Sequence, residues 1–195
     1  MVEMTRRTQG VQQGARSVQV VEAVRAATVS ELARVGYAAL TIDGVAKAAR
    51  VNRTTIYRRW PTRSALLHAV LEPLLTRYDT VPDAGSSWRD LSSLLRMVRD
   101  NVDLPEGRAF SEAARSTAVE LQDLVASVLE RALAPFHSVL ARAVERGEID
   151  PGQRDLIAQL AFFGVVMWDQ THTEPLSDGE CDKMAQLLLP RSAAT

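Results

Sequence analysis

A short stretch in the first third of the chain carries basic and hydroxyl side chains at the spacing of one helical face. These residues are Arg53, Thr54, Tyr57 and Arg58. Ile56 and Trp60, four positions apart, would pack inwards and turn that face outwards. An arginine can fork onto guanine O6 and N7, a threonine methyl can touch a thymine methyl, and a tyrosine hydroxyl can hydrogen-bond a phosphate. Thr55 and Arg59 flank the face and can hold the backbone. This chemistry suits a DNA groove.

Capping residues on either side of this face predict the helices that must position it. Thr41 can cap a short helix from Ile42 to Ala49, and Asn52 can cap a second from Arg53 to Trp60. Pro61 ends that second helix, and Thr62 can cap a fourth helix, 63–78. Two short helices separated by three or four residues form a helix-turn-helix. Lys47, on the first of the two, is a further candidate for DNA contact.

The charge of the chain is divided unequally. Residues 1–65 hold 11 Lys and Arg against 4 Asp and Glu, a net charge of +7, whereas residues 66–195 carry a net charge of −8. The whole chain has a net charge of −1, which hides this division. A basic first third on an acidic remainder is typical of a protein whose first third meets a polyanion, although segregation by chance is an equal alternative.

The run Val51–Arg63 resembles the DNA-binding domain of the TetR family of transcriptional regulators. The resemblance rests on a Thr-x-Tyr core at 55–57, followed by an aromatic residue, a proline, a small N-cap and a basic residue, and it covers residues 17–72. It implies that Thr41, Thr55, Tyr57 and Arg63 contact phosphates and that Arg53, Thr54 and Arg58 face bases. Two positions depart from the family pattern: Arg50 stands where the turn usually has glycine, and Ser64 stands where an acid is common. An arginine in a left-handed turn costs about 1 kcal/mol.

The rest of the sequence predicts an all-α protein of about nine helices, because helical spacing of apolar residues recurs and strand patterns do not. The first helix is expected over 17–35, ended by Gly36, and the longest over 118–146, bent at Pro135. The predicted organisation has four parts: a flexible basic arm at 1–16, the helix-turn-helix domain at 17–62, a connecting helix at 63–80, and a helical regulatory and dimerisation domain at 81–195.

The second half of the chain has two features that indicate partners. The segment Leu156–Trp168 is apolar nearly all round, so one side can face its own bundle while the other requires a second partner. A homodimer supplies it, and two-fold symmetry also doubles the DNA site that one recognition helix can read. The family resemblance here is looser and rests on helix number and on the Arg-Gly-Glu-Ile-Asp-Pro and Glu-Pro-Leu-Ser stretches. It implies a domain that senses a small-molecule effector.

Candidate effector contacts are the larger apolar residues of the predicted bundle, together with one histidine. They are Met97, Phe110, Leu124, Val128, Phe136, His137, Phe163, Met167 and Trp168. For any single one of these residues, an ordinary core position is the more common role. Asp169 and His172 share a helical face but lack a third metal ligand at readable spacing, and Cys181, the single cysteine, has no resolving partner. No metal or cofactor is therefore expected.

Two other functional classes compete with a regulator. An enzyme is disfavoured because the chain has no Gly-rich phosphate loop, nucleophile elbow or metal motif. A helical adaptor that binds proteins without DNA function remains the alternative, and it leaves the basic first third unexplained. The longest apolar run, 161–168, is too short to span a membrane, and no targeting segment is apparent, so we expect a cytoplasmic protein. The expected function is a repressor that binds a palindromic double-stranded DNA operator as a homodimer and is released by a small molecule.

Overall fold

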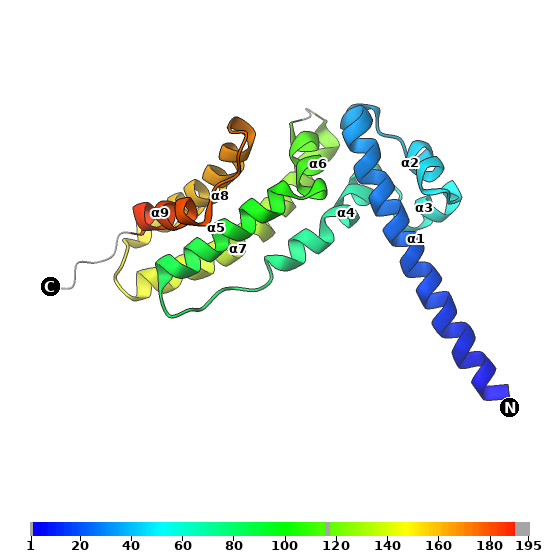
Figure 1. The fold of residues 1–195 in the computed structure, drawn as a ribbon, viewed down its shortest axis with the longest axis horizontal. Helices are drawn as coiled ribbons and strands as arrows, with labels where there is room; N and C mark the ends of the chain where they lie inside the picture. The colour runs from blue at the N-terminus through cyan, green and yellow to red at the C-terminus, as the bar shows by residue number, and fades with distance from the viewer. Residues whose placement is uncertain (1, 116–117, 190–195) are drawn as a thin grey trace. The chain divides into compact units, whose positions relative to one another are not determined.

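The computed structural model describes residues 2–115 and 118–189, and side chains from 17 onwards within those ranges. The described residues form nine α-helices and no strand, as the sequence predicted (Figure 1). They divide into two compact units: residues 2–70 with 112–121, and residues 71–111 with 122–189. The division falls inside a helix, whereas the sequence suggested boundaries at residues 62 and 80. The segment 112–121 joins the first unit although it lies far along the chain.

The first unit is built on three N-terminal helices: α1 (Val2–Ala39), α2 (Ile42–Ala49) and α3 (Arg53–Arg59). α2 packs against both α1 and α3. Val45 and Ile56 are fully buried and join Val24, Leu32 and Leu66 in one core. The predicted inward packing of α3 through Ile56 onto α2 is therefore confirmed, and Trp60 beside it is half-buried.

α1 is longer than the sequence suggested at both ends. It begins at Val2, so residues 2–16 continue the helix instead of forming a separate arm. The first 16 residues contain no proline that would end a helix. At the other end Gly36 adopts the left-handed φ of 71° expected of a terminating glycine, yet helical turns resume beyond it to Ala39. This extra turn places Tyr37 in the core, where it is 3% exposed.

α4 (Arg63–Arg77) belongs to both units, since residues up to Val70 lie in the first and those from Leu71 in the second. Pro73 interrupts its backbone hydrogen bonding just past this division. In the second unit Arg131 holds the end of α4, donating to Glu72 and Asp79 at 3.0 and 2.7 Å. The C-terminal part of α4 is thereby fixed to the second unit's helices.

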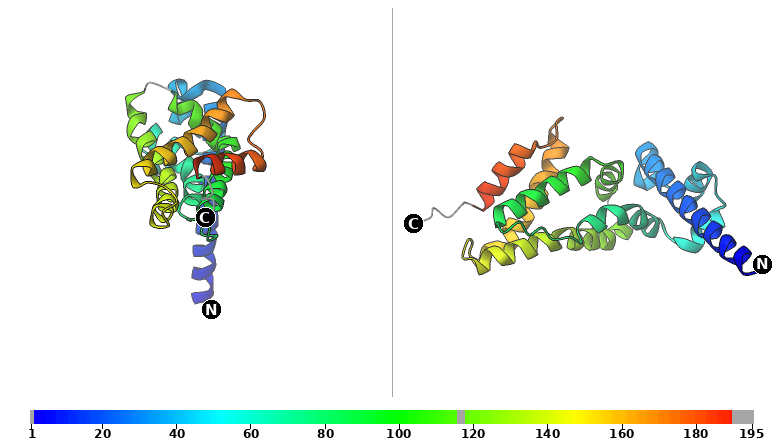
Figure 2. Two further views of the ribbon diagram at one scale, coloured as in Figure 1. Left: turned by 90° about the vertical axis from the view of Figure 1, so that its left-hand side faces the viewer. Right: turned by 60° about the horizontal axis from the view of Figure 1, so that its bottom comes forward.

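The second unit is a helical bundle with α5 (Ser87–Asp103) at its centre. α5 packs against α7 (Gln122–Glu145), α8 (Arg154–Thr171) and α9 (Asp178–Leu188), as Figure 2 shows from two further sides. α6 (Pro105–Ala114) follows α5 directly, and a 3-10 turn, η1 (Val119–Leu121), precedes α7. A second 3-10 turn (Pro151–Gln153) leads into α8, with Asp150 as the predicted N-cap.

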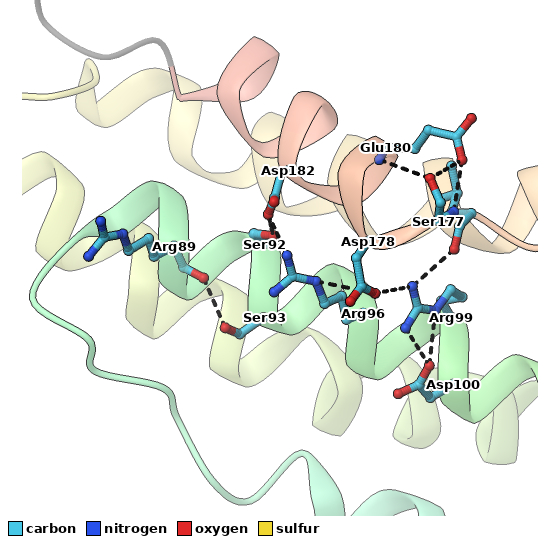
Figure 3. Close-up of polar contacts among 11 residues, drawn as sticks. Arg89, Ser92, Ser93, Arg96, Arg99, Asp100, Ser177, Asp178, Glu180 and Asp182 are labelled. Atoms are coloured by element: carbon cyan, nitrogen blue, oxygen red, sulfur yellow. Dashed lines mark hydrogen bonds and ion pairs between the residues drawn. The ribbon is translucent and has the colours of Figure 1, made fainter.

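Ion pairs fasten α9 along α5 (Figure 3). Arg96 donates to Asp182 at 2.6 Å, and Arg99 donates to Asp178 at 2.7 Å. Both arginine side chains are at least two-thirds buried, but Asp182 is 38% and Asp178 is 70% exposed, so each pair is open to solvent on its acidic side and contributes little on its own. Beneath them Cys181 is fully buried, and burial raises the pKa of its thiol, so it behaves as a packing residue.

The segment Val119–Glu145 is long and apolar enough to cross a membrane by length and composition. Within the second unit its apolar side is the bundle core, where Leu124, Val128, Phe136 and Leu140 are buried. The core helix of a soluble bundle passes the same length and composition test.

Candidate nucleic-acid interface

The two helices of the predicted helix-turn-helix are each fixed by the cap that the sequence indicated. The Thr41 hydroxyl accepts a hydrogen bond from the Gly44 N–H at 3.0 Å, which starts α2. The Asn52 side chain accepts from the Thr54 N–H at 2.8 Å, which starts α3. Such caps are worth about 1 kcal/mol each. They set where α3 begins and therefore which of its residues face outwards.

The turn between α2 and α3 is formed by Arg50 in a left-handed conformation, with φ 55° and ψ 39°. Its backbone N–H closes α2 by reaching the carbonyls of Ala46 and Lys47. Arg50 is the only non-glycine residue with positive φ in the described ranges. The strain predicted from the sequence, about 1 kcal/mol relative to glycine, is present at this turn.

Most of the predicted DNA contacts lie on the surface of the first unit. The exposed ones are Thr41, Lys47, Arg53, Thr54, Tyr57 and Arg58. Tyr57 is 47% exposed, although tyrosine is usually at least partly buried when it serves only packing. Asp43 lies 3.7 Å from Arg53, but both side chains are more than 60% exposed, so this pair constrains Arg53 little. The exposed face of α3 is thus cationic and available.

The remaining predicted contacts are held by the protein itself. Thr55 is half-buried. The Arg59 guanidinium donates to the Ser17 hydroxyl on α1 at 3.0 Å. Arg63 donates to the backbone carbonyls of Tyr37 and Leu40 at 3.3 and 3.2 Å, where α1 ends.

Arg63 also donates to the carboxylate of Glu120, in η1, which belongs to the same unit. The Tyr37 hydroxyl donates to the same carboxylate at 3.0 Å, and the Arg63 guanidinium lies 4.9 Å from the centre of the Tyr37 ring. Burial, followed by the Glu120 contact, raises the pKa of Tyr37 to about 12. Glu120 could not be predicted as a partner of Arg63, because it stands 57 positions away in the sequence with no local motif around it.

Comparison with known proteins agrees with this geometry. Residues 24–70 match the family described as bacterial regulatory proteins, tetR family, and residues 81–188 match the tetracyclin repressor-like C-terminal domain. The chain belongs to the TetR family. TetR-family proteins are DNA-binding transcriptional regulators, and the first of these two matches coincides with the helix-turn-helix described above.

Two curated relatives and one solved structure extend the similarity over most of the chain. The DNA-binding transcriptional repressor TetR of Mycobacteroides abscessus is 33% identical over 65% of this chain and 68% of its own length. The regulator AqdR of Rhodococcus erythropolis is 30% identical over 77% of this chain and 74% of its own. The structure of FadR from Bacillus subtilis with stearoyl-CoA superposes with a TM-score of 0.70 at 20% identity, covering 89% of this chain and 98% of FadR. The last comparison supports the fold.

The predicted effector contacts separate into two groups in the second unit of this TetR-family chain. Leu124, Val128 and Phe136 are buried, and the Phe136 ring meets Phe162 edge-on at 6.1 Å. Met97 and Phe110 are half-buried, and His137 lies 3.5 Å from Asp155. These six side chains are therefore buried or half-buried within the second unit.

Three others lie towards the surface of α8. Phe163 and Met167 are 38% and 51% exposed, so they do not line an interior cavity of this unit. Trp168 stacks on His172 with ring centres 3.8 Å apart, and its indole N–H donates to the carbonyl of Glu174. His172 therefore packs against the indole ring of Trp168. The sequence had placed it on the same helical face as Asp169.

A buried polar pair in the second unit was not predicted. Asn101, on the core side of α5, is 4% exposed, and neither amide atom makes a hydrogen bond of normal geometry. The Tyr78 phenol is 6% exposed beside it; burial raises the pKa of Tyr78, and the neighbouring Asn101 opposes that change. The Tyr78 phenol is therefore a polar neighbour of this amide, and a buried amide left short of hydrogen bonds costs about 1–3 kcal/mol.

A separate surface hollow of about 320 Å³ lies between α5 and α9. It is lined by Ala84, Trp88, Arg89, Ser92, Ser93, Arg96 and Asp182. None of these residues is among the predicted effector contacts. Figure 3 shows that Ser92, Arg96 and Asp182 are occupied with one another there.

Proposed function

We propose that this protein is a cytoplasmic repressor that binds a palindromic operator as a homodimer and leaves it when a small molecule binds the second unit. The observation that carries the proposal is the exposed face of α3. Arg53, Thr54, Tyr57 and Arg58 are all exposed on a short helix whose start is fixed by Asn52. Such a face suits base edges and phosphates of one major groove.

A dimer is supported by an apolar stripe along α8. Leu156, Leu160, Phe163 and Met167 repeat at intervals of three and four residues, which places them on one side of the helix. All four are between 38% and 61% exposed, and Leu187 on the neighbouring α9 is 81% exposed. A contiguous patch of this kind typically marks a protein interface. A second copy of the same stripe related by two-fold symmetry would cover it and pair the two recognition helices.

An effector site is supported by the unsatisfied amide of Asn101. A ligand that offers both an acceptor and a donor would satisfy the two amide atoms, and apolar groups of the ligand would suit the buried leucines and the valine that share this face of α5. The similar repressor of Mycobacteroides abscessus and the similarly folded regulator FadR, solved with stearoyl-CoA, favour this assignment. The effector we infer is therefore a largely apolar small molecule with one polar group.

A signal can pass from the effector site to α3 through α4. One end of α4 follows α3 through Pro61 and Thr62, and the other end is fastened by Arg131 in the second unit. A ligand that favours one conformation of the second unit by 1–3 kcal/mol would change DNA affinity by about 5- to 150-fold.

The test begins with selection of bound sequences from a random pool of duplex DNA. A regulator should enrich a palindrome and bind it with strong salt dependence. Metabolites that raise the melting temperature are then added to the operator complex, and release of DNA is the expected result. No enrichment and weak, salt-insensitive binding would favour the protein-binding adaptor.

A further inference from the structure

Among the described side chains of the first unit, Arg63 is the most heavily engaged cation. Its guanidinium donates to backbone carbonyls at the end of α1 and to the Glu120 carboxylate, and it lies over the Tyr37 ring. One-third of the Arg63 side chain remains exposed, as does about half of Glu120. The pair is thus open to solvent and to ions on one side. The Glu120 carboxylate neutralises the charge of Arg63, which would otherwise add to the positive charge of the exposed basic face.

The position of Arg63 puts it within reach of a DNA backbone when α3 lies in a groove. Its hydrogen bonds end at Leu40, one residue before Thr41, which caps α2. In a helix-turn-helix the first of the two helices crosses the phosphate backbone. The N–H groups at the start of α2 and the Arg63 guanidinium therefore lie at the same end of that helix. A phosphate held there would compete with the Glu120 carboxylate for the same donor.

We propose that Glu120 sets DNA affinity by competing with a backbone phosphate for Arg63. Glu120 is a positioning residue that acts through Arg63 and makes no contact with DNA. While the Arg63–Glu120 pair is closed, Arg63 adds little positive charge; when a phosphate replaces Glu120, one further phosphate contact forms. The inference rests on the proposed DNA-binding function, but the two can fail separately.

The central variant is Glu120→Gln, which keeps the size of the side chain and an acceptor for Tyr37 but removes the charge. The matched control is Glu112→Gln, because Glu112 is an exposed acid of the same segment that pairs with Arg115 instead. Both variants change the net charge by the same amount. Glu120→Gln is repeated in two backgrounds without the cation, Arg63→Met and Arg63→Gln. Tyr37→Phe tests whether the tyrosine hydrogen bond matters on its own.

The assay is fluorescence anisotropy of a labelled random-sequence duplex, titrated with each full-length variant at several salt concentrations. Non-specific binding is governed by phosphate contacts, so no operator is needed. One added contact steepens the log–log salt slope by about 0.9, which amounts to about 3.5-fold in affinity between 50 and 200 mM salt. We expect this extra salt dependence and tighter binding at low salt for Glu120→Gln. Glu112→Gln, Tyr37→Phe and both Arg63 backgrounds should lack it.

Circular dichroism melts accompany every variant. The proposed competition for Arg63 is refuted if Glu120→Gln binds DNA no more tightly than Glu112→Gln. It is also refuted if the gain in DNA affinity persists in the backgrounds that lack the Arg63 charge. A lower melting temperature with weaker binding would assign the pair a structural role and also overturn the proposal. If the wild-type protein itself shows no salt-dependent binding, the DNA-binding function fails first, and that outcome is distinct from the others.

Discussion

Truncation of one leucine on α8 should weaken the dimer by a predictable factor. Leu160 is 53% exposed in the single chain, at the middle of the stripe. Complete burial of a leucine is worth about 1.5–3 kcal/mol, so covering its exposed half contributes about 0.8–1.6 kcal/mol. Two-fold symmetry uses the residue twice, giving about 1.6–3.2 kcal/mol per dimer. Leu160→Ala should therefore raise the dimer dissociation constant about 15- to 200-fold.

Sedimentation velocity over a dilution series measures this change. Leu104→Ala is the matched control, because Leu104 is a partly exposed leucine of the second unit that lies at the end of α5 and outside the stripe. The control should leave the dissociation constant unchanged. A wild-type protein that is monomeric at micromolar concentration, or equal behaviour of the two variants, would refute the assignment of the α8 stripe as the interface.

Three further predictions concern DNA readout, acid stability and the buried amide. Arg53→Ala should relax base preference at one position of each half-site at a cost of about 1–3 kcal/mol, whereas Tyr57→Phe should weaken all duplexes alike; sequence selection separates the two. The Arg99 hydrogen bond holds the pKa of Asp178 below its unfolded value near 3.8. The contribution of this pair to folding stability is therefore fully present above pH 3.8, and it is lost as the pH falls through the pKa of the folded state. Melts in acid should therefore show a shallower loss of stability for Asp178→Asn than for the wild type. Asn101→Leu should stabilise the apoprotein by about 1–3 kcal/mol in urea titrations and abolish effector release; a destabilised variant would mean that the amide is satisfied.

The helix-turn-helix could be predicted closely because its determinants are local. Thr41 and Asn52 cap helices within three residues of themselves, and the inward position of Ile56 follows from helical periodicity. The unusual turn at Arg50 was also visible, since the sequence departs from glycine at a position that needs positive φ. Short-range hydrogen bonding and steric limits therefore sufficed for the exposed face of α3.

The features that were missed depend on contacts between distant parts of the chain. Glu120 reaches Arg63 only because the segment 112–121 packs with the first unit. No periodicity in the sequence indicates this packing. Asn101 had a readable signal: it follows Val98 by three positions on the apolar stripe of α5, so a polar residue interrupts a core face. A polar residue on such a face is a better pointer to a ligand than the apolar residues around it. Phe163 and Met167 were likewise predicted to line a pocket, but both are exposed and belong to the α8 stripe.

The charge division acquires a structural meaning once the units are known. The basic residues that remain exposed on the first unit, such as Lys47, Arg53 and Arg58, are close to the α3 face. By contrast, arginines of the second unit such as Arg96, Arg99 and Arg131 are paired with carboxylates on neighbouring helices. Paired cations release few counterions from DNA, whereas unpaired ones release about one each. Binding strength should therefore follow the small set of exposed cations near α3 that are unpaired or, like Arg53, only weakly paired, which makes the closure of one further pair, Arg63 with Glu120, a sensitive point of control.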